Sequence, residues 1–254
     1  MRRVLYADMF NVFKNKIFQG SIALTVIYPL MEALLFKLIY RFLAAQLPGE
    51  DAITAYSSIA SIVITATIIF LLVNDFSDGA IRNKIINGVK RNHIALSSIL
   101  TGAIISGLMC MSTCISQTIV IRFLTTGFSS LNPRDVSLYY TAQFAVSVAV
   151  GVLMSSIVIV FGGTIIPYFL GLVIAFLFRV ANLMVTDKLY PQDGHVMITG
   201  MRLLIYNIYD RFCPFSYFTG TLNHPLKDCF IGCGVLIAIS ILITLPVFKR
   251  KELK

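Results

Sequence analysis

Six long apolar runs constrain what this chain can fold into more than any other feature of its sequence. They cover residues 17–44, 55–73, 94–123, 139–161, 165–185 and 229–248. A helix needs about 20 residues, each adding about 1.5 Å, to cross the hydrocarbon core of a bilayer. The sequence therefore predicts an all-α integral membrane protein with six transmembrane helices.

Composition indicates that lipid is the main solvent of the chain. Of its 254 residues, 57% are hydrophobic and only 13% are charged, whereas about 25% of the residues of a soluble domain are charged. Mean hydropathy is +0.83. The net charge of +9 is divided among segments beside the apolar runs and forms no continuous basic face, so we expect no nucleic-acid partner.

The fourth and fifth apolar runs are separated only by Gly162, Gly163 and Thr164. Two adjacent glycines favour a tight turn. Pro167 is suited to the first turn of a helix, where the missing N–H has no partner to lose. We therefore expect two separate spans here and not one very long helix.

The distribution of Lys and Arg predicts the side of the membrane that each segment occupies. With the N-terminus inside, three inner segments hold 12 of the 21 Lys and Arg residues. They are Arg2, Arg3, Lys14, Lys16, Arg82, Lys84, Lys90, Arg91, Lys249, Arg250, Lys251 and Lys254. Cytoplasmic loops are enriched in these residues, and an even number of spans places both termini and residues 74–93 on one side. We therefore expect a multi-pass protein of the cell membrane with both termini in the cytoplasm.

The segment before the first span, MRRVLYADMFNVFKNK, predicts an amphipathic helix over residues 1–16. One helical face holds Leu5, Met9, Val12 and Phe13, and the remaining surface holds Arg3, Asp8, Asn11 and Asn15. A helix of this kind lies in the inner headgroup layer of the membrane lipid. The alternative is a solvated extension of the first span.

Residues 74–98, NDFSDGAIRNKIINGVKRNHIALSS, are an island of charge between two apolar runs. Ser77 or Asp78 is suited to cap a helix N-terminus. An apolar repeat every four residues follows, with basic and polar residues around it, and Gly88 loosens the helix before Arg91. The repeat consists of Ile81, Ile85 and Val89. Such a helix suits docking into a groove of a cytoplasmic partner; the alternative is a helix that lies on lipid, its charges placed by the positive-inside rule alone.

This segment resembles the loop between the second and third spans of ABC-2 type transporter permeases. In that family an acidic residue and a Gly precede a T/A-I-R-N-K core, which a Gly, a basic residue and an aliphatic-Leu-Ser sequence follow. The matching residues are Asp78, Gly79, Ile81, Arg82, Asn83, Lys84, Gly88, Arg91, Leu96 and Ser97. The six-span layout, the N-terminal helix and the basic tail extend the resemblance along the chain.

The resemblance implies a permease subunit whose coupling helix, residues 77–92, contacts a separate P-loop ABC ATPase. Arg82, Lys84 and Arg91 would be the charged contacts. The apolar contacts would be Ile81, Ile85 and Val89. The resemblance also implies two ATPase copies, which bind ATP and magnesium, and a second permease chain, identical or different.

Small permeases with this loop resemble those of antimicrobial-peptide immunity and of amphipathic toxin-peptide (phenol-soluble-modulin-like) export. The expected cargo is therefore an amphipathic or antimicrobial peptide, exported from the cell or removed from its membrane. Low charge, many Ile and Asn residues and no Trp indicate a Gram-positive bacterium as the source. The division expected within one transmembrane domain, residues 1–254, is an interfacial helix (1–16), five spans (17–185), an extracellular segment (186–226) and a last span with a basic tail (227–254).

The chain has no phosphate-binding motif of its own. No G-x-x-x-x-G-K-[ST] sequence is present, and no Gly is followed directly by Lys. H-E-x-x-H and G-x-S-x-G are also absent, and the five Cys residues have no zinc-ligand spacing. We expect a chain that is not an enzyme and holds no cofactor or metal. The alternative to an ATPase partner is an ion gradient, which would make the protein a secondary transporter of a small solute or drug.

Glu32 interrupts the first apolar run just after Pro29. A charge at the bilayer centre costs at least about 2.5–3.5 kcal/mol, so this carboxylate should face protein or water. It either lines the translocation path, where it would attract cationic or amphipathic cargo, or forms a structural pair. Lys37, Arg41 and Arg179 lie closer to the outer interface and are expected to snorkel.

Residues 186–226 are rich in aromatic residues but contain no run long enough to span. Met197, Met201, Leu204, Ile205, Ile208 and Phe212 lie along one helical face. In ABC-2 permeases the region before the last span forms short helices that dip into the outer leaflet, and this segment is similar. The alternative is an ordinary surface loop on the headgroups.

Overall fold

The computed structural model describes residues 2–42, 46–49, 53, 57–128, 132–162, 164–191, 198–219 and 225–251. Over these residues it contains nine α-helices and one short 3-10 helix. Six helices are long and apolar enough to cross a membrane. They are α2 (Lys16–Phe42), α4 (Ser57–Ser77), α6 (Arg91–Leu124), α7 (Pro133–Phe161), α8 (Ile166–Leu189) and α10 (Leu226–Arg250). The predicted all-α, six-span architecture is confirmed, including the break between the fourth and fifth spans.

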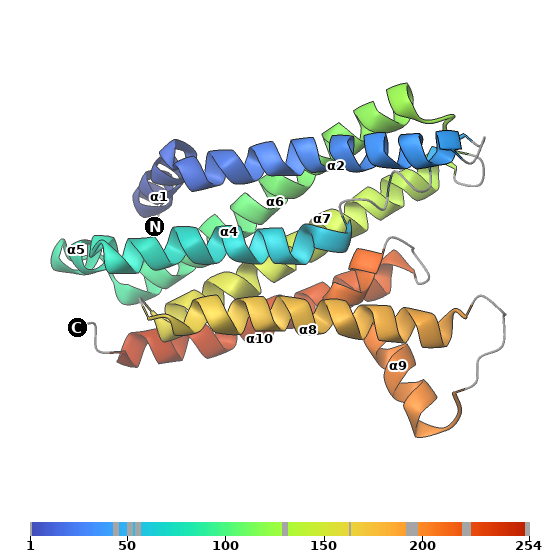
Figure 1. The fold of residues 1–254 in the computed structure, drawn as a ribbon. Helices are drawn as coiled ribbons and strands as arrows, with labels where there is room; N and C mark the ends of the chain where they lie inside the picture. The colour runs from blue at the N-terminus through green and yellow to red at the C-terminus, as the bar shows by residue number, and fades with distance from the viewer. Residues whose placement is uncertain are drawn as a thin grey trace.

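Helices α4, α6 and α7 form the centre of the bundle. In their most apolar windows 56%, 67% and 61% of the residues are buried, compared with 17% in α2 and 22% in both α8 and α10. Helix α7 packs against α6, α10 and α4, while α2 lies on α6 and α8 lies on α4 (Figure 1). The three outer helices therefore present most of their apolar surface to the surrounding lipid.

Small residues bring α6 and α7 into close contact. A Cβ atom on Gly102 would lie 1.8 Å from Ser155 Oγ, and a Cβ atom on Gly151 would lie 2.7 Å from the carbonyl oxygen of Gly102. The hydroxyls of Ser106 and Ser155 donate hydrogen bonds to the carbonyls of Gly102 and Gly151, at 2.9 and 2.8 Å. Glycine is required at both positions because the two backbones touch.

Hydroxyl groups attach α2 to the centre of the bundle. Thr25 and Ser112 Oγ atoms are 2.7 Å apart, which joins α2 to α6. Thr67 donates to Ser21 at 2.8 Å, which joins α4 to α2. Such contacts replace the hydrophobic driving force, which is absent between helices in lipid.

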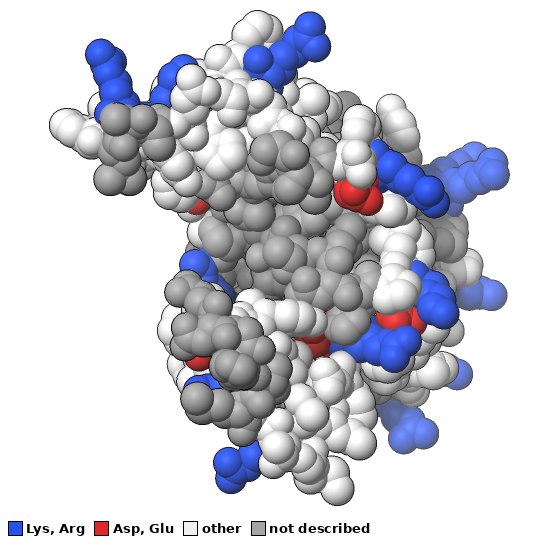
Figure 2. Space-filling view, turned by 90° about the vertical axis from the view of Figure 1, so that its right-hand side faces the viewer, with Lys and Arg blue, Asp and Glu red and all other residues white. Residues whose placement is uncertain are grey.

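Both described ends of the chain lie at the same end of the bundle as the segment between spans two and three (Figure 1). Helices α1 (Arg2–Lys14) and α5 (Ala80–Ile86) are found there, and we call it the α1–α5 end. The opposite end holds α9 (Met201–Phe212) and the 3-10 helix η1 (Pro214–Thr219). In a view onto that end, the Lys and Arg side chains that are drawn lie mainly around the edge (Figure 2).

The short helix predicted before the last span is confirmed as α9. The side chains of Met201, Leu204, Ile205, Ile208 and Phe212 are all exposed along one face, whereas Asp210 on the opposite side is buried. Met197, predicted on the same face, lies outside the described residues. The exposed face of α9 has the character of a helix that lies in a leaflet.

Helix η1 is fixed between the ends of the spans by side-chain hydrogen bonds to its backbone. Gln143 donates to the carbonyl of Tyr217 at 2.6 Å, and the Asn182 amide donates to the carbonyl of Phe215. The ring of Phe178 stacks on Phe215 with 4.3 Å between the centroids. Arg211 pairs with the buried Asp228 at 2.6 Å. The segment is thus fastened to α7, α8 and α10 and is not a free surface loop.

Replacing Gly151 by Val should force α6 and α7 apart, because the new side chain would meet Ser106 and the Gly102 carbonyl. We expect destabilisation of about 1–3 kcal/mol and a Tm lowered by about 5 °C in detergent. The matched control is Gly20→Val in α2, where a Cβ atom would meet nothing within 4 Å. Equal Tm values for the two variants would contradict the close backbone contact.

Candidate functional site

Two glycines with left-handed backbone conformations delimit α5. Gly79 has a φ of 71° and Gly88 a φ of 79°. The predicted cap is wrong: α5 has no side-chain cap, and Ser77 belongs to α4, where its hydroxyl donates to the carbonyl of Val73 at 3.1 Å. The predicted helix over residues 77–92 is also too long, because α5 spans only Ala80–Ile86 and α6 begins at Arg91.

The apolar repeat of this segment faces the bundle. Ile81 is 3% exposed and packs in a cluster with partly buried Ile85 and Val89. The other members of that cluster include Ile94, Ile99, Val152, Ile159 and Phe248. Ile81, predicted as an ATPase contact, is thus buried within its own chain, in a cluster with residues of α6, α7 and α10. The helix uses its apolar repeat to attach itself to its own spans.

A different apolar side chain points outward from α5. Ile86 is 72% exposed. Around it, the side chains of Arg82, Asn83, Asn87 and Lys90 are exposed. We call these five residues the α5 tip. An exposed isoleucine surrounded by two cations and two amides is suited to a partner with an apolar socket and an acidic rim.

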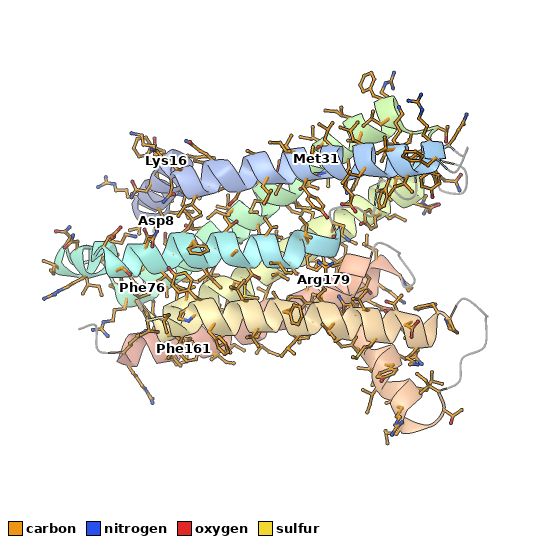
Figure 3. The ribbon with its side chains drawn as sticks, viewed as in Figure 1. Asp8, Lys16, Met31, Phe76, Phe161 and Arg179 are labelled. Atoms are coloured by element: carbon orange, nitrogen blue, oxygen red, sulfur yellow. The ribbon has the colours of Figure 1, made fainter. Side chains whose placement is uncertain are left out.

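Asp8 of α1 binds side chains of α5 and α6. Its carboxylate is 5% exposed and accepts hydrogen bonds from Lys84 Nζ at 2.5 Å and from Ser97 Oγ at 2.6 Å. The three residues join α1, α5 and α6, and Figure 3 shows Asp8 at the α1–α5 end. Removing one partner of a charge pair buried in this way strongly destabilises the fold, because the other charge stays buried without compensation. Lys84, predicted as an ATPase contact, is thus engaged within the chain.

Arg91 and Lys251 fasten the ends of three spans. Arg91 Nη1 donates to the carbonyls of Lys249 and Lys251, at 3.2 and 2.5 Å, at the C-terminus of α10. Lys251 Nζ donates to the carbonyl of Val160, at 2.9 Å, at the C-terminus of α7. Cations are favoured at these sites because the last carbonyls of a helix lack intrahelical partners. Burial of its ammonium group lowers the pKa of Lys251.

Asp8 was not predicted from the sequence as a site residue. Asp8 is the first acidic residue of the chain and no other precedes Glu32. A lone carboxylate on a short helix with three cations was the available signal. Ser97 was matched as part of the family-like sequence, and its hydrogen bond to Asp8 gives a structural reason for a serine at that position.

The face of α1 that was predicted to lie in lipid packs partly on the bundle. Val12 is buried, and Leu5 and Met9 are half-buried. Of the predicted face only Phe13 is exposed, at 51%, and the aromatic side chains exposed with it are Tyr6 and Phe10, at 75% and 49%. The predicted helix is confirmed, but it is rotated because Asp8 turns inward to Lys84.

Glu32 lies in the middle part of α2 and is half-buried. Its Oε2 atom is buried and has no hydrogen bond, while the Tyr28 side chain hydrogen-bonds to the carboxylate and Arg179 attracts it. Figure 3 shows Arg179 on α8 and Met31, the neighbour of Glu32, on α2. Helix α4 packs against both of these helices. The two charges thus come from opposite sides of α4.

Metal-binding chemistry has no candidate among the described residues, where no group of three His, Cys, Asp or Glu side chains is placed to hold an ion. Cys110 and Cys114 have their sulfur atoms 4.0 Å apart within α6. Both sit on a span packed against other spans, where cysteine acts as a small apolar residue.

Comparison with known proteins adds no family to these observations: no protein-family model matches the chain, and no curated protein does.

Replacing Asp8 by Asn should loosen α5, because Lys84 then keeps its charge without a carboxylate partner. Loss of a charge-assisted hydrogen bond is worth about 1.5–3 kcal/mol, so local opening should increase about tenfold or more. Trypsin cleavage after the exposed Arg82 in open membrane fragments measures this opening. Asp78→Asn, at an exposed carboxylate of the same segment, is the matched control; equal cleavage rates in both variants would refute the role of Asp8.

Proposed function

We propose that this multi-pass membrane protein is the permease subunit of an ATP-driven exporter, coupled to a separate ATPase through the α5 tip. The observation that carries the proposal is the exposure of Ile86 between Arg82 and Lys90. A solvated loop gains nothing from an isoleucine that is 72% exposed, whereas a docking helix needs an apolar anchor near the centre of its contact.

The attachment of α5 supports a role in transmitting movement. Ile81 belongs to a buried cluster with residues of α6, α7 and α10, and Lys84 joins α5 to α1 through Asp8. Helix α5 also contacts α4 and α6, so a displacement of the α5 tip acts directly on α1, α4 and α6. The resemblance of residues 78–97 to the coupling loop of ABC-2 permeases points the same way.

The full complex in this proposal contains two copies of a P-loop ATPase, which bind ATP and magnesium, and a second permease chain. The α1–α5 end faces the cytoplasm, where ATP is available. The cargo class in this proposal is an amphipathic peptide, which the family resemblance implies; Glu32 of α2 and Arg179 of α8 supply charges of both signs within the spans.

The first experiment is purification of the protein from its native membrane in mild detergent, with identification of any bound ATPase. Ile86→Asp should weaken ATPase binding at least about tenfold, since it places a charge at the anchor of the contact. Arg82→Glu should weaken it by reversing the charge at the rim. Lys84 is left unchanged in these variants because it pairs with Asp8.

Ile165→Asp provides the matched control for Ile86→Asp. Ile165 is 81% exposed and precedes α8 at the same end of the bundle, but it lies outside the α5 tip. An ATPase that still binds Ile86→Asp, or that is lost equally from Ile165→Asp, would exclude the α5 tip as the docking site.

One observation favours a second candidate function, a gradient-driven secondary transporter of a small solute or drug. Glu32 places a carboxylate with a buried, unbonded Oε2 atom inside a span, and such groups carry protons in many transporters. Glu32→Gln should abolish transport driven by a pH gradient if this function is correct. An ATP-driven permease should instead keep its transport rate and change only its preference among cargo peptides of different charge.

Vesicles that contain the protein, with an imposed pH gradient and no ATP, distinguish the two functions. Uptake of solute under these conditions, lost in Glu32→Gln and retained in Glu32→Asp, would replace the exporter by the gradient-driven carrier. Transport only when ATP and the ATPase are both present would reject the carrier.

A further inference from the structure

Helix α1 presents an aromatic and cationic surface that no part of the described chain covers. Tyr6, Phe10 and Phe13 follow one another at helical spacing and are 75%, 49% and 51% exposed. On the other side of the helix, Asp8 and Val12 are buried against the bundle. The helix therefore has one side for the protein and one for the surroundings.

The charge on the outward side has a single sign. Arg2, Arg3, Lys14 and Lys16 are exposed around the aromatic residues. The one acidic residue of this region, Asp8, is turned inward and neutralised by Lys84 at 2.5 Å. Lys14 Nζ lies 4.1 Å from the centroid of the Phe10 ring, so cationic and aromatic groups form one continuous surface.

The position of α1 directly before a membrane span indicates that lipid headgroups cover this surface. Lys16, the first residue of α2, follows α1 after the single residue Asn15, and α2 is a membrane span. The boundary between membrane and water thus passes beside α1. Aromatic rings are favoured at the headgroup level, and clustered cations beside a span attract anionic lipids. Zwitterionic lipids offer no net charge to complement these four cations.

We propose that α1 binds anionic phospholipid headgroups of the leaflet at the α1–α5 end. Arg2, Arg3, Lys14 and Lys16 contact the phosphate groups, and the aromatic rings of Tyr6, Phe10 and Phe13 insert between the headgroups.

The binding of lipid to α1 also bears on α5, a step that rests on the proposed function. Asp8 lies midway along α1 and holds Lys84 of α5 and Ser97 of α6. A leaflet that fixes α1 therefore fixes the support of the α5 tip. Anionic lipid is expected to raise the ATPase activity of the complex through this connection.

The absence of Trp from the sequence allows a direct test with Phe10→Trp as the single tryptophan of the full chain. The protein is placed in vesicles of equal parts phosphatidylglycerol and phosphatidylcholine. In one preparation only the phosphatidylglycerol carries bromine, which quenches nearby tryptophan, and in the other only the phosphatidylcholine does. The lipid composition is the same in both, so only the identity of the neighbouring lipid is measured.

We expect brominated phosphatidylglycerol to quench the Phe10→Trp fluorescence at least about twofold more than brominated phosphatidylcholine, because the cations enrich anionic lipid around α1. Phe169→Trp is the matched control. Phe169 is 73% exposed at the start of α8, on the same end of the bundle, and no Lys or Arg lies within a turn of it. Both lipids should quench this variant equally.

Further variants assign the preference to the cations. Arg2→Gln, Arg3→Gln and Lys14→Gln combined with Phe10→Trp should make quenching by the two lipids equal. Equal quenching already in the unmodified Phe10→Trp protein would overturn the proposal, and so would absence of quenching by either lipid, which would indicate a protein neighbour. An unchanged Tm of Phe10→Trp establishes that the fold is intact.

The connection to α5 is measured separately, as ATP hydrolysis by the purified complex at increasing phosphatidylglycerol content. Wild-type activity should rise with the anionic lipid, whereas Asp8→Asn should respond several-fold less. A response of equal size in Asp8→Asn would overturn the connection while leaving the lipid site intact. A preparation without any ATPase would refute the proposed function, and the quenching result would still decide the lipid site.

Discussion

The direct backbone contact between α6 and α7 is the constraint on which the rest of the fold depends. Side chains are missing at Gly102 and Gly151, so these two spans approach more closely than any bulky residue would permit. Helix α4 and helix α10 then pack on α7, α2 packs on α6, and α8 packs on α4. In lipid, where apolar surface gains nothing from association, close van der Waals contact and hydroxyl pairs hold such a core together. The apolar side chains of the outer helices are left for the bilayer.

Cations at the α1–α5 end have two distinct uses. Lys84, Arg91 and Lys251 bind groups of their own chain: a carboxylate for Lys84, and helix-terminal carbonyls for Arg91 and Lys251. Arg82 and Lys90 of the α5 tip face outward, as do the cations of α1. The positive-inside rule accounts for the location of both sets but does not separate them. Burial and hydrogen-bond partners distinguish the two sets of cations, and only the outward-facing set remains available for a partner or a lipid.

Hydropathy and length were sufficient to predict the spans, because crossing a bilayer requires about 20 apolar residues whatever the packing. Gly162 and Pro167 were likewise enough to separate α7 from α8. The same reasoning did not predict the burial of Ile81, since a repeat every four residues shows that a helix has an apolar side but not whether that side meets its own bundle or another protein. Asp8 and Lys84 are 76 residues apart, and nothing local in the sequence pairs them. Tertiary contacts of this kind follow only from the arrangement of the helices.

Gly79 and Gly88 have open space where a Cβ atom would be, so backbone conformation and not crowding selects glycine at both. A left-handed residue with a side chain costs roughly 1–2 kcal/mol. Helix α5 is thus a short segment of 7 residues, about 10 Å long, with a left-handed glycine near each end. Ile86 lies on the exposed side of this helix and Ile81 on its buried side. Because this helix is so short, a displacement of the exposed Ile86 would move the buried Ile81 by a similar distance.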